Sequence, residues 1–179
     1  LGLLLTTKLK FHDIGGGEEI FASEDGILAV NAGTRINTTA PTVALFAATE
    51  VIVNSPKLSM WTSNSGRPIV SLECFNADAL GATLQFVKDG ASVADNDVVG
   101  TIKFISEDDG SAVQTYATIE STIADMTAGS EGGKLTLSVA SHDGGLEPGL
   151  LLSDGNLDAE VDVTLGNGTA SVTAVVGNL

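Results

Sequence analysis

The sequence is poor in cysteine, in aromatic residues and in long apolar runs. Its one cysteine, Cys74, cannot form an intrachain disulfide, which excludes a disulfide scaffold. Six Phe, one Tyr and one Trp leave few large side chains with which to fill a core. No run reaches the ~18 consecutive apolar residues of a membrane span, so we expect no membrane insertion. Cys74 stands in an alternating run without an adjacent His, which favours a buried apolar role over a nucleophile.

Basic residues are also scarce. Eight Lys and Arg stand against 23 Asp and Glu, which gives a formal net charge of −15. Nucleic-acid binding requires a basic stripe that neutralises phosphates, so we expect no nucleic-acid partner. The acidity is typical of a highly soluble exposed surface. A cation-rich host surface as partner is the functional alternative.

Glycine and small side chains are abundant instead. Glycine accounts for 21 of 179 residues, against the usual ~7 per cent. A compact globular domain of this composition would be thinly packed, whereas a slender shaft would bury small side chains between subunits. Short isolated strands cannot bury enough apolar surface to offset their ordering entropy. The composition therefore predicts an obligate oligomer.

The first part of the chain alternates with a period of two, as β-strands do. We expect short strands at the following runs: 27–31, 34–37, 42–47 and 50–54. The gaps between them carry Gly33, Pro41 and the Asn54-Ser55-Pro56 turn. Runs of about five residues at this tight spacing indicate a fibrous β-arrangement, so we assign residues 1–58 to an N-terminal β shaft.

The second part has longer alternating runs and no helical stripe. The expected strands are 69–75, 83–87, 99–105, 114–123 and 134–140. Polar links with Asp-Gly and Gly-Gly pairs separate them and supply the positive φ values of tight turns. The simplest interpretation of residues 59–155 is a β-meander of five strands.

The last part, residues 156–179, resembles a hairpin. Residues 161–165 alternate, Gly166-Asn167-Gly168 forms the turn, and the alternation resumes at 171–176. The sequence leaves open whether these two strands pair with each other or with neighbouring subunits. We assign the segment to the start of a further shaft repeat.

Residues 76–135 carry an ordered set of motifs. In chain order these are Asn76-Ala77-Asp78-Ala79, Gly81, Leu84, Phe86, Lys88-Asp89, Ala94-Asp95-Asn96-Asp97-Val98, Gly100, Ile102, Phe104, Asp108-Asp109, Tyr116-Ala117, Ala124-Asp125, Gly129-Ser130-Glu131 and Gly133-Lys134-Leu135. Their order and spacing resemble the repeat of bacteriophage tail-fibre proteins. The final segment similarly resembles a short T-x-G-N-G-x-x-S-x-T module of phage fibre shafts.

The resemblance implies an all-β, elongated trimeric fibre, in which a short-strand β shaft precedes a β-meander module and the subunits are intertwined. It implies a structural virion protein, on the tail or the head, that mediates host attachment and is not an enzyme. The expected partners are two further copies of the chain, other tail or capsid proteins and a host cell-surface glycan. No cofactor, metal or catalytic residue is expected. The chain is expected to be a segment of a longer protein.

Two other interpretations remain open. One is a head fibre or capsid decoration protein, or a bacterial surface adhesin built from similar modules. The other is a tailspike that cleaves host polysaccharide, which would need a pair of carboxylates in a groove. The position of the protein on the virion would separate a tail fibre from a head fibre.

The residues that could carry chemistry form weak patterns. Asp95, Asn96 and Asp97, and then Glu107, Asp108 and Asp109, offer oxygen ligands for Ca²⁺, but neither run has the order of a dedicated calcium loop. We interpret both as solvated turns. The other candidates are His12-Asp13 and His142-Asp143 as metal ligands, Gly15-Gly16-Gly17 as a phosphate loop, and Trp61 and Tyr116 as sugar-stacking aromatics. None has the partners that its chemistry requires.

Overall fold

The computed structural model describes most of the chain, in two compact units that comprise residues 1–69 and 70–179. The described residues are 9–10, 19–24, 27–31, 35–38, 42–45 and 50–177. Every regular element among them is a β-strand, which confirms the all-β class. The described residues contain no helix long and apolar enough to cross a membrane.

The first unit contains a small antiparallel sheet of order β1-β2-β3. Its strands are β1 (Leu9–Lys10), β2 (Glu19–Glu24) and β3 (Ile27–Asn31). β3 confirms the strand predicted at 27–31, and β2 pairs with it along its length.

The other strands predicted in the N-terminal shaft are not found. Residues 35–38, 42–45 and 50–54 have no regular structure, while Thr34 and residues 46–47 lie outside the described residues. Because a strand exists only as part of a hydrogen-bonded ladder, alternation alone does not create one. These runs have no ladder partner among the residues that the structure describes.

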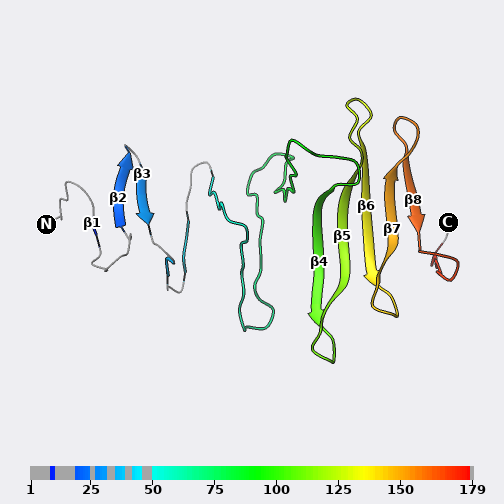
Figure 1. Ribbon diagram of the computed structural model, residues 1–179, viewed down its shortest axis with the longest axis horizontal. Coiled ribbons are helices and arrows are strands. Elements are labelled where there is room, and N and C mark those ends of the chain that lie inside the picture. The colour runs from blue at the N-terminus through cyan, green and yellow to red at the C-terminus, as the bar shows by residue number, and fades with distance from the viewer. Residues whose placement is uncertain are drawn as a thin grey trace. The chain divides into compact units, whose positions relative to one another are not determined.

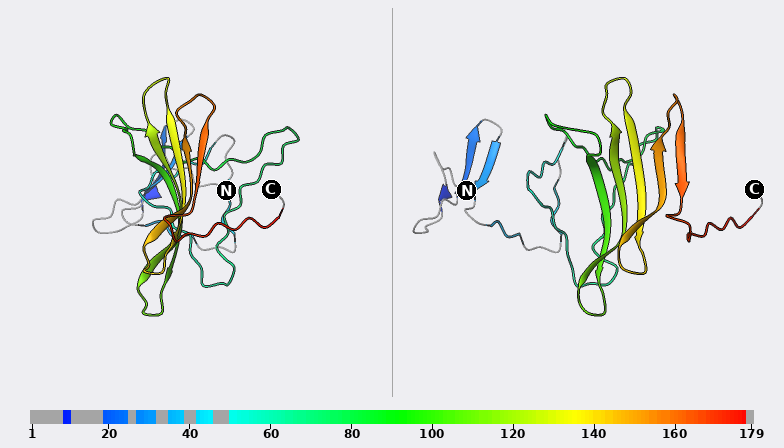
Figure 2. Two further views of the ribbon diagram at one scale, coloured as in Figure 1. Left: turned by 90° about the vertical axis from the view of Figure 1, so that its right-hand side faces the viewer. Right: turned by 45° about the vertical axis from the view of Figure 1, so that its right-hand side comes forward.

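The second unit is dominated by a five-stranded antiparallel meander of order β4-β5-β6-β7-β8 (Figure 1). The strands are β4 (Val98–Glu107), β5 (Val113–Asp125), β6 (Gly132–Ala140), β7 (Leu146–Asp154) and β8 (Val161–Leu165). The turned views show these strands as one twisted layer (Figure 2). β4, β5 and β6 confirm the strands predicted at 99–105, 114–123 and 134–140.

Five strands were predicted within residues 59–155, but this range forms four, β4 to β7, and the fifth strand of the sheet, β8, lies beyond it. Residues 69–75 and 83–87 are not strands, and no residue from 68 to 93 makes a backbone–backbone hydrogen bond to another described residue. The chain turns back between these runs, where Cys74 Sγ lies 3.9 Å from the carbonyl oxygen of Leu80. They form an open loop without a ladder.

β7 was not predicted because Pro148 and Gly149 interrupt its apolar pattern. Its register against β6 shifts between the pairs Leu137–Leu150 and Ser138–Pro148, which leaves Gly149 as an extra residue. Such a bulge is a position at which a strand tolerates Pro and Gly. The carbonyl of Gly149 accepts a hydrogen bond from the Gly166 amide, 2.9 Å away, where β8 ends.

β8 confirms the strand at 161–165, but its partner is β7 and not the run 171–176. Residues 171–176 have no regular structure, so the hairpin interpretation is wrong within one chain. Their valines are largely exposed, including Val172 at 91% and Val176 at 96%. The predicted boundary at 155/156 lies between β7 and β8, which are neighbours in one sheet.

The described residues form no hydrophobic core within one chain. No apolar side chain among the described residues is buried, and the most buried polar one is Thr118, in the middle of β5. The accessible surface is 15704 Å², about twice the ~8,000 Å² expected for a folded monomer of 18.2 kDa. A single sheet normally buries one face against another layer.

We expect Gly100→Ala to destabilise the second unit by about 1–3 kcal/mol, the usual cost of overpacking. A Cβ on Gly100 would lie 2.8 Å from both Cβ and Cγ of Phe86, so the ring would have to move. Gly90→Ala is the control, because a Cβ there meets nothing within 4 Å. Urea unfolding measures both variants. Equal stability would show that Phe86 does not pack on β4.

Candidate functional site: the two faces of the five-stranded sheet

The register of the meander gathers apolar side chains on one face. Residues directly opposite each other on neighbouring strands point to the same side of a sheet. One row crosses all five strands through Ile102, Ile119, Leu137, Leu150 and Leu165. We call this side the apolar face.

The adjacent rows extend the apolar face in both directions. One runs through Gly100, Ser121, Leu135, Leu152 and Val163, and the other through Phe104, Ala117, Val139 and Glu147. Glu147, at the β7 end of its row, is the one charged residue in these three rows, and its carboxylate accepts a hydrogen bond from the Asn167 side-chain amide. A face of this composition is suited to packing against another protein layer.

The residues between those of the apolar rows point to the opposite side of the sheet, which we call the polar face. A central row there contains Thr101, Glu120, Thr136, Leu151 and Thr164. The Thr101 hydroxyl donates a hydrogen bond of 3.1 Å to Glu120 Oε2 across the two strands. Lys103, Lys134 and Asp162 also lie on this face. The composition of the polar face is suited to exposure to solvent.

The apolar face is largely uncovered. Phe104 is 53% exposed, Val163 is 59% exposed and Leu165 is 57% exposed. Side chains on the middle strands, such as Ile119 and Leu137, are only half-buried, although they lie at the centre of the sheet. The chain therefore presents a contiguous apolar surface of the kind that marks protein interaction sites.

One corner of the apolar face is covered from within the chain. Phe86 lies over Gly100 on β4, and together with Ile102, Ile119 and Leu135 it lines a shallow depression. Gly100 permits this contact because it has no side chain. The contact fixes one point of the loop that precedes β4.

The turn before β4 is held by the residues of the Ala94–Val98 motif. The Asp95 carboxylate accepts a hydrogen bond of 2.9 Å from the Met126 amide, and the Asn96 amide donates one of 2.8 Å to the Ile123 carbonyl. Asn96 has a φ of 67°, which Asn tolerates better than most residues. The motif thus fastens the start of β4 to the end of β5.

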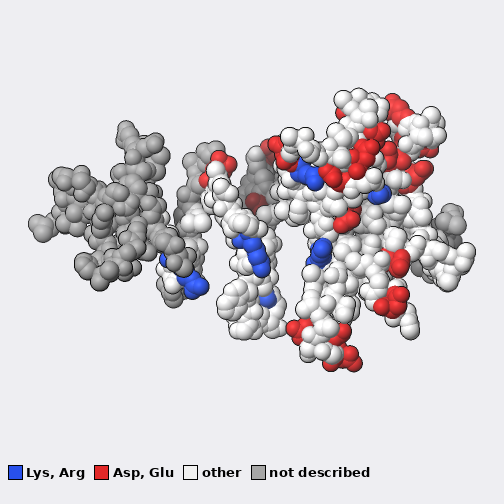
Figure 3. Space-filling view, in the orientation of Figure 1, with Lys and Arg blue, Asp and Glu red and all other residues white. Residues whose placement is uncertain are grey.

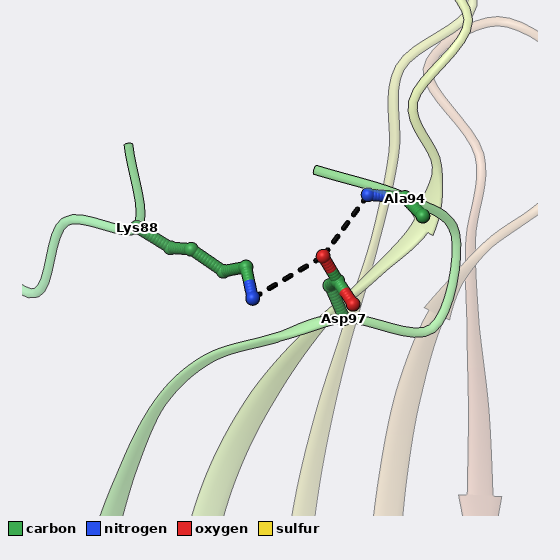
Figure 4. Close-up of polar contacts among 3 residues, drawn as sticks. All are labelled: Lys88, Ala94 and Asp97. Carbon is green, nitrogen blue, oxygen red and sulfur yellow. Dashed lines mark hydrogen bonds and ion pairs between the residues drawn. The ribbon is translucent and has the colours of Figure 1, made fainter. Parts of the chain in front are cut away.

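Asp97 closes the same turn. Its carboxylate accepts a hydrogen bond of 3.0 Å from the Ala94 amide and lies 3.2 Å from Lys88 Nζ (Figure 4). The Ala94 hydrogen bond, and then the hydrogen bond and charge of Lys88, lower the pKa of Asp97 below its ordinary value. An exposed ion pair of this kind contributes little by itself, so the backbone hydrogen bond is the main local restraint.

Four other acidic residues cap turns in the same way. Asp108 accepts hydrogen bonds from the Gly110 and Ala112 amides, and Asp143 from the Ser141 hydroxyl and the Gly145 amide. The largest causes are the Ala112 backbone for Asp108 and the Ser141 side chain for Asp143, and each lowers the pKa. The pKa values of Asp125 and Glu131 are lowered by Thr127 and by the Gly129 amide, respectively.

The two runs proposed as alternative Ca²⁺ ligands are thus both turns. Asp95 and Asp97 direct carboxylate oxygens at backbone amides, and so does Asp108. Among the described residues, no group of three or more His, Cys, Asp and Glu side chains could hold a metal ion. Acidic side chains gather at the two ends of the sheet, in the connections between strands, and leave its middle mostly uncharged (Figure 3).

The remaining candidate residues are scattered. Trp61 is 88% exposed in the first unit, whereas Tyr116 is half-exposed on β5 and its hydroxyl lies 3.5 Å from the Glu107 carbonyl. Cys74 is exposed, so the expectation that it is buried is wrong within one chain. His142 lies in the β6–β7 turn. His12-Asp13 and Gly15-Gly16-Gly17 lie outside the described residues.

No family model, curated protein or solved structure matches this chain.

Acid should weaken the turns that Asp97, Asp108 and Asp143 cap. Their pKa values are lower in the folded chain than in the unfolded chain, so this stabilisation is present above about pH 4 and is lost as pH falls further. Thermal unfolding between pH 3 and pH 7 measures the loss. Protonation also relieves repulsion in a chain of net charge −15, so each variant is compared with wild type. Asp97→Ala should show a shallower fall below pH 4, and an unchanged fall would contradict this role.

Proposed function

We propose that this chain is part of a structural virion fibre, a phage tail fibre that projects from the particle and mediates host attachment. It acts as an intertwined homotrimer and performs no catalysis. The observation that carries the proposal is an uncovered apolar sheet face together with the absence of a buried core among the residues that the structure describes. A fold that is incomplete as a monomer is expected of a subunit that buries its apolar surface only in an assembly.

The loop at residues 68–93 gives independent support. Backbone amides and carbonyls without protein partners are acceptable in water, but the alternating apolar residues there, such as Leu84 and Phe75, favour a packed environment. Pairing with strands of neighbouring subunits would satisfy both requirements. Intertwining would also cover strand edges that otherwise promote aggregation.

The motifs that resemble tail-fibre repeats have consistent local roles in the fold. The Ala94–Val98 turn docks the start of β4 on β5, Asp108 shapes the β4–β5 turn, and Glu131 caps the β5–β6 turn. These residues stabilise a repeat unit. A receptor would therefore be bound by other surfaces. Such roles fit a mechanical protein better than an enzyme, because the carboxylates are engaged with backbone amides.

Immunogold labelling of virions with antibodies against this chain tests the proposal. Label along the tail fibres, together with reduced phage adsorption when purified chain is added to host cells, is the expected result. Label on the capsid would identify the protein as a head fibre or decoration protein. Absence of label from particles would refute a virion role. Release of reducing sugars from host polysaccharide by the purified chain would instead identify a tailspike.

A further inference from the structure

The apolar face of the sheet has the composition of a self-association surface. We propose that, in the fibre, this face points toward the threefold axis and packs against the same face of the other two copies, with the polar face in water. The inference rests on the proposed homotrimer and adds which side of β4–β8 is buried. The row Ile102, Ile119, Leu137, Leu150 and Leu165 would then form one layer of a shared interior.

The size of the face suits this role. Five strands at about 4.8 Å spacing and about nine residues at ~3.4 Å per residue give a face of about 700 Å². Stable interfaces bury about 800 Å² per partner. The apolar face alone therefore provides nearly the surface that a specific assembly needs, without a contribution from the rest of the chain.

The charge distribution of the sheet is compatible with copies of this chain as the occupant. Identical chains of net charge −15 repel one another, so they associate most readily through a surface that carries little charge. The row through Ile102 and Ile119 and the row through Gly100 and Ser121 are uncharged, and the third row carries one charge, Glu147, at its β7 end. Glu120, Lys103, Lys134 and Asp162 all lie on the polar face. The acidic turns lie at the strand ends, where they remain in water.

The chain itself covers only a corner of this face. Phe86 occupies the position over Gly100, and the neighbouring row through Ile119 and Leu137 stays only half-buried. Sheets that pack face to face lie about 10 Å apart with interdigitated side chains. Leu, Ile and Val in successive rows provide such side chains, and Phe86 would mark the rim of the shared interior.

Site-specific labelling tests the orientation without adding charge. In a Cys74→Ser background, Leu137→Cys places a thiol on the apolar face and Thr136→Cys places one on the polar face, at adjacent positions of β6. We expect maleimide to label Leu137→Cys about tenfold or more slowly than Thr136→Cys in the native assembly, and equally fast after denaturation.

The outcomes separate the two proposals. A trimer in which Leu137→Cys is protected supports the inference. A trimer in which both thiols react at the same rate overturns it and leaves the fibre proposal intact. A monomer or dimer by light scattering refutes the homotrimer itself. If Leu137→Cys does not assemble, the pair Val163→Cys and Asp162→Cys on β8 gives the same comparison.

Discussion

Ile119→Lys is expected to convert the proposed trimer into monomers. Ile119 lies at the centre of the apolar face, between Ile102 and Leu137, so three ammonium groups would enter a shared apolar interior without partners. Leaving a buried charge uncompensated costs about 3 kcal/mol or more per chain. Size-exclusion chromatography with light scattering measures the change in mass.

Thr136→Lys is the matched control. Thr136 lies on the polar face of β6 directly opposite Glu120, so a lysine there gains a cross-strand partner of opposite charge. This variant should remain trimeric, with stability within about 0.5 kcal/mol of wild type. A trimeric Ile119→Lys protein, or equal disruption by both substitutions, would contradict the burial of the apolar face.

The backbone amides of residues 69–75 and 83–87 should be strongly protected from hydrogen exchange in the assembly. These amides have no backbone partner among the described residues of one chain, so they should exchange fast in a monomer. Pairing between subunits would slow exchange about 100-fold or more, which corresponds to about 2.8 kcal/mol at 1.4 kcal/mol per tenfold.

Two internal references make this measurement decisive. The centre of β5 has ladder partners on both sides within the chain, so it should be protected in every state that keeps the sheet. The His142 amide in the β6–β7 turn has no hydrogen-bond partner among the described residues, so it should exchange fast throughout. If residues 69–75 and 83–87 exchange as fast as the His142 amide in an intact trimer, the intertwining proposed for this part of the chain is wrong.

Alternation in the sequence predicted the strands that have a ladder within the chain. Runs rich in β-branched residues between Asp-Gly and Gly-Gly turns became β4, β5 and β6. The same alternation at 69–75 and 83–87 gave no strand, because pairing depends on a partner that the sequence does not specify. Composition also indicated a thin core, and the structure has no buried apolar side chain among the described residues.

The register of the sheet could not be predicted from the sequence. Assigning Ile102, Ile119 and Leu137 to one row requires a bulge between Phe104 and Ile105 in the β4–β5 ladder and another between Ile123 and Asp125 in the β5–β6 ladder, each of which shifts the pairing by one residue. The Pro148-Gly149 pair also hid β7, which carries Leu150 and Leu152. The acidic turn residues, in contrast, were recognisable, since Asp and Gly in short polar links commonly form such turns.

The mass of the purified chain in solution tests the central claim most directly. Light scattering should give a trimer of about 55 kDa, three copies of an 18.2 kDa chain, and negative-stain images should show a rod. Because no apolar side chain in the described part of the chain is buried, assembly is a condition of stability in this account. A stable, folded monomer of about 18 kDa would contradict it, because the apolar face would then remain in water without a partner.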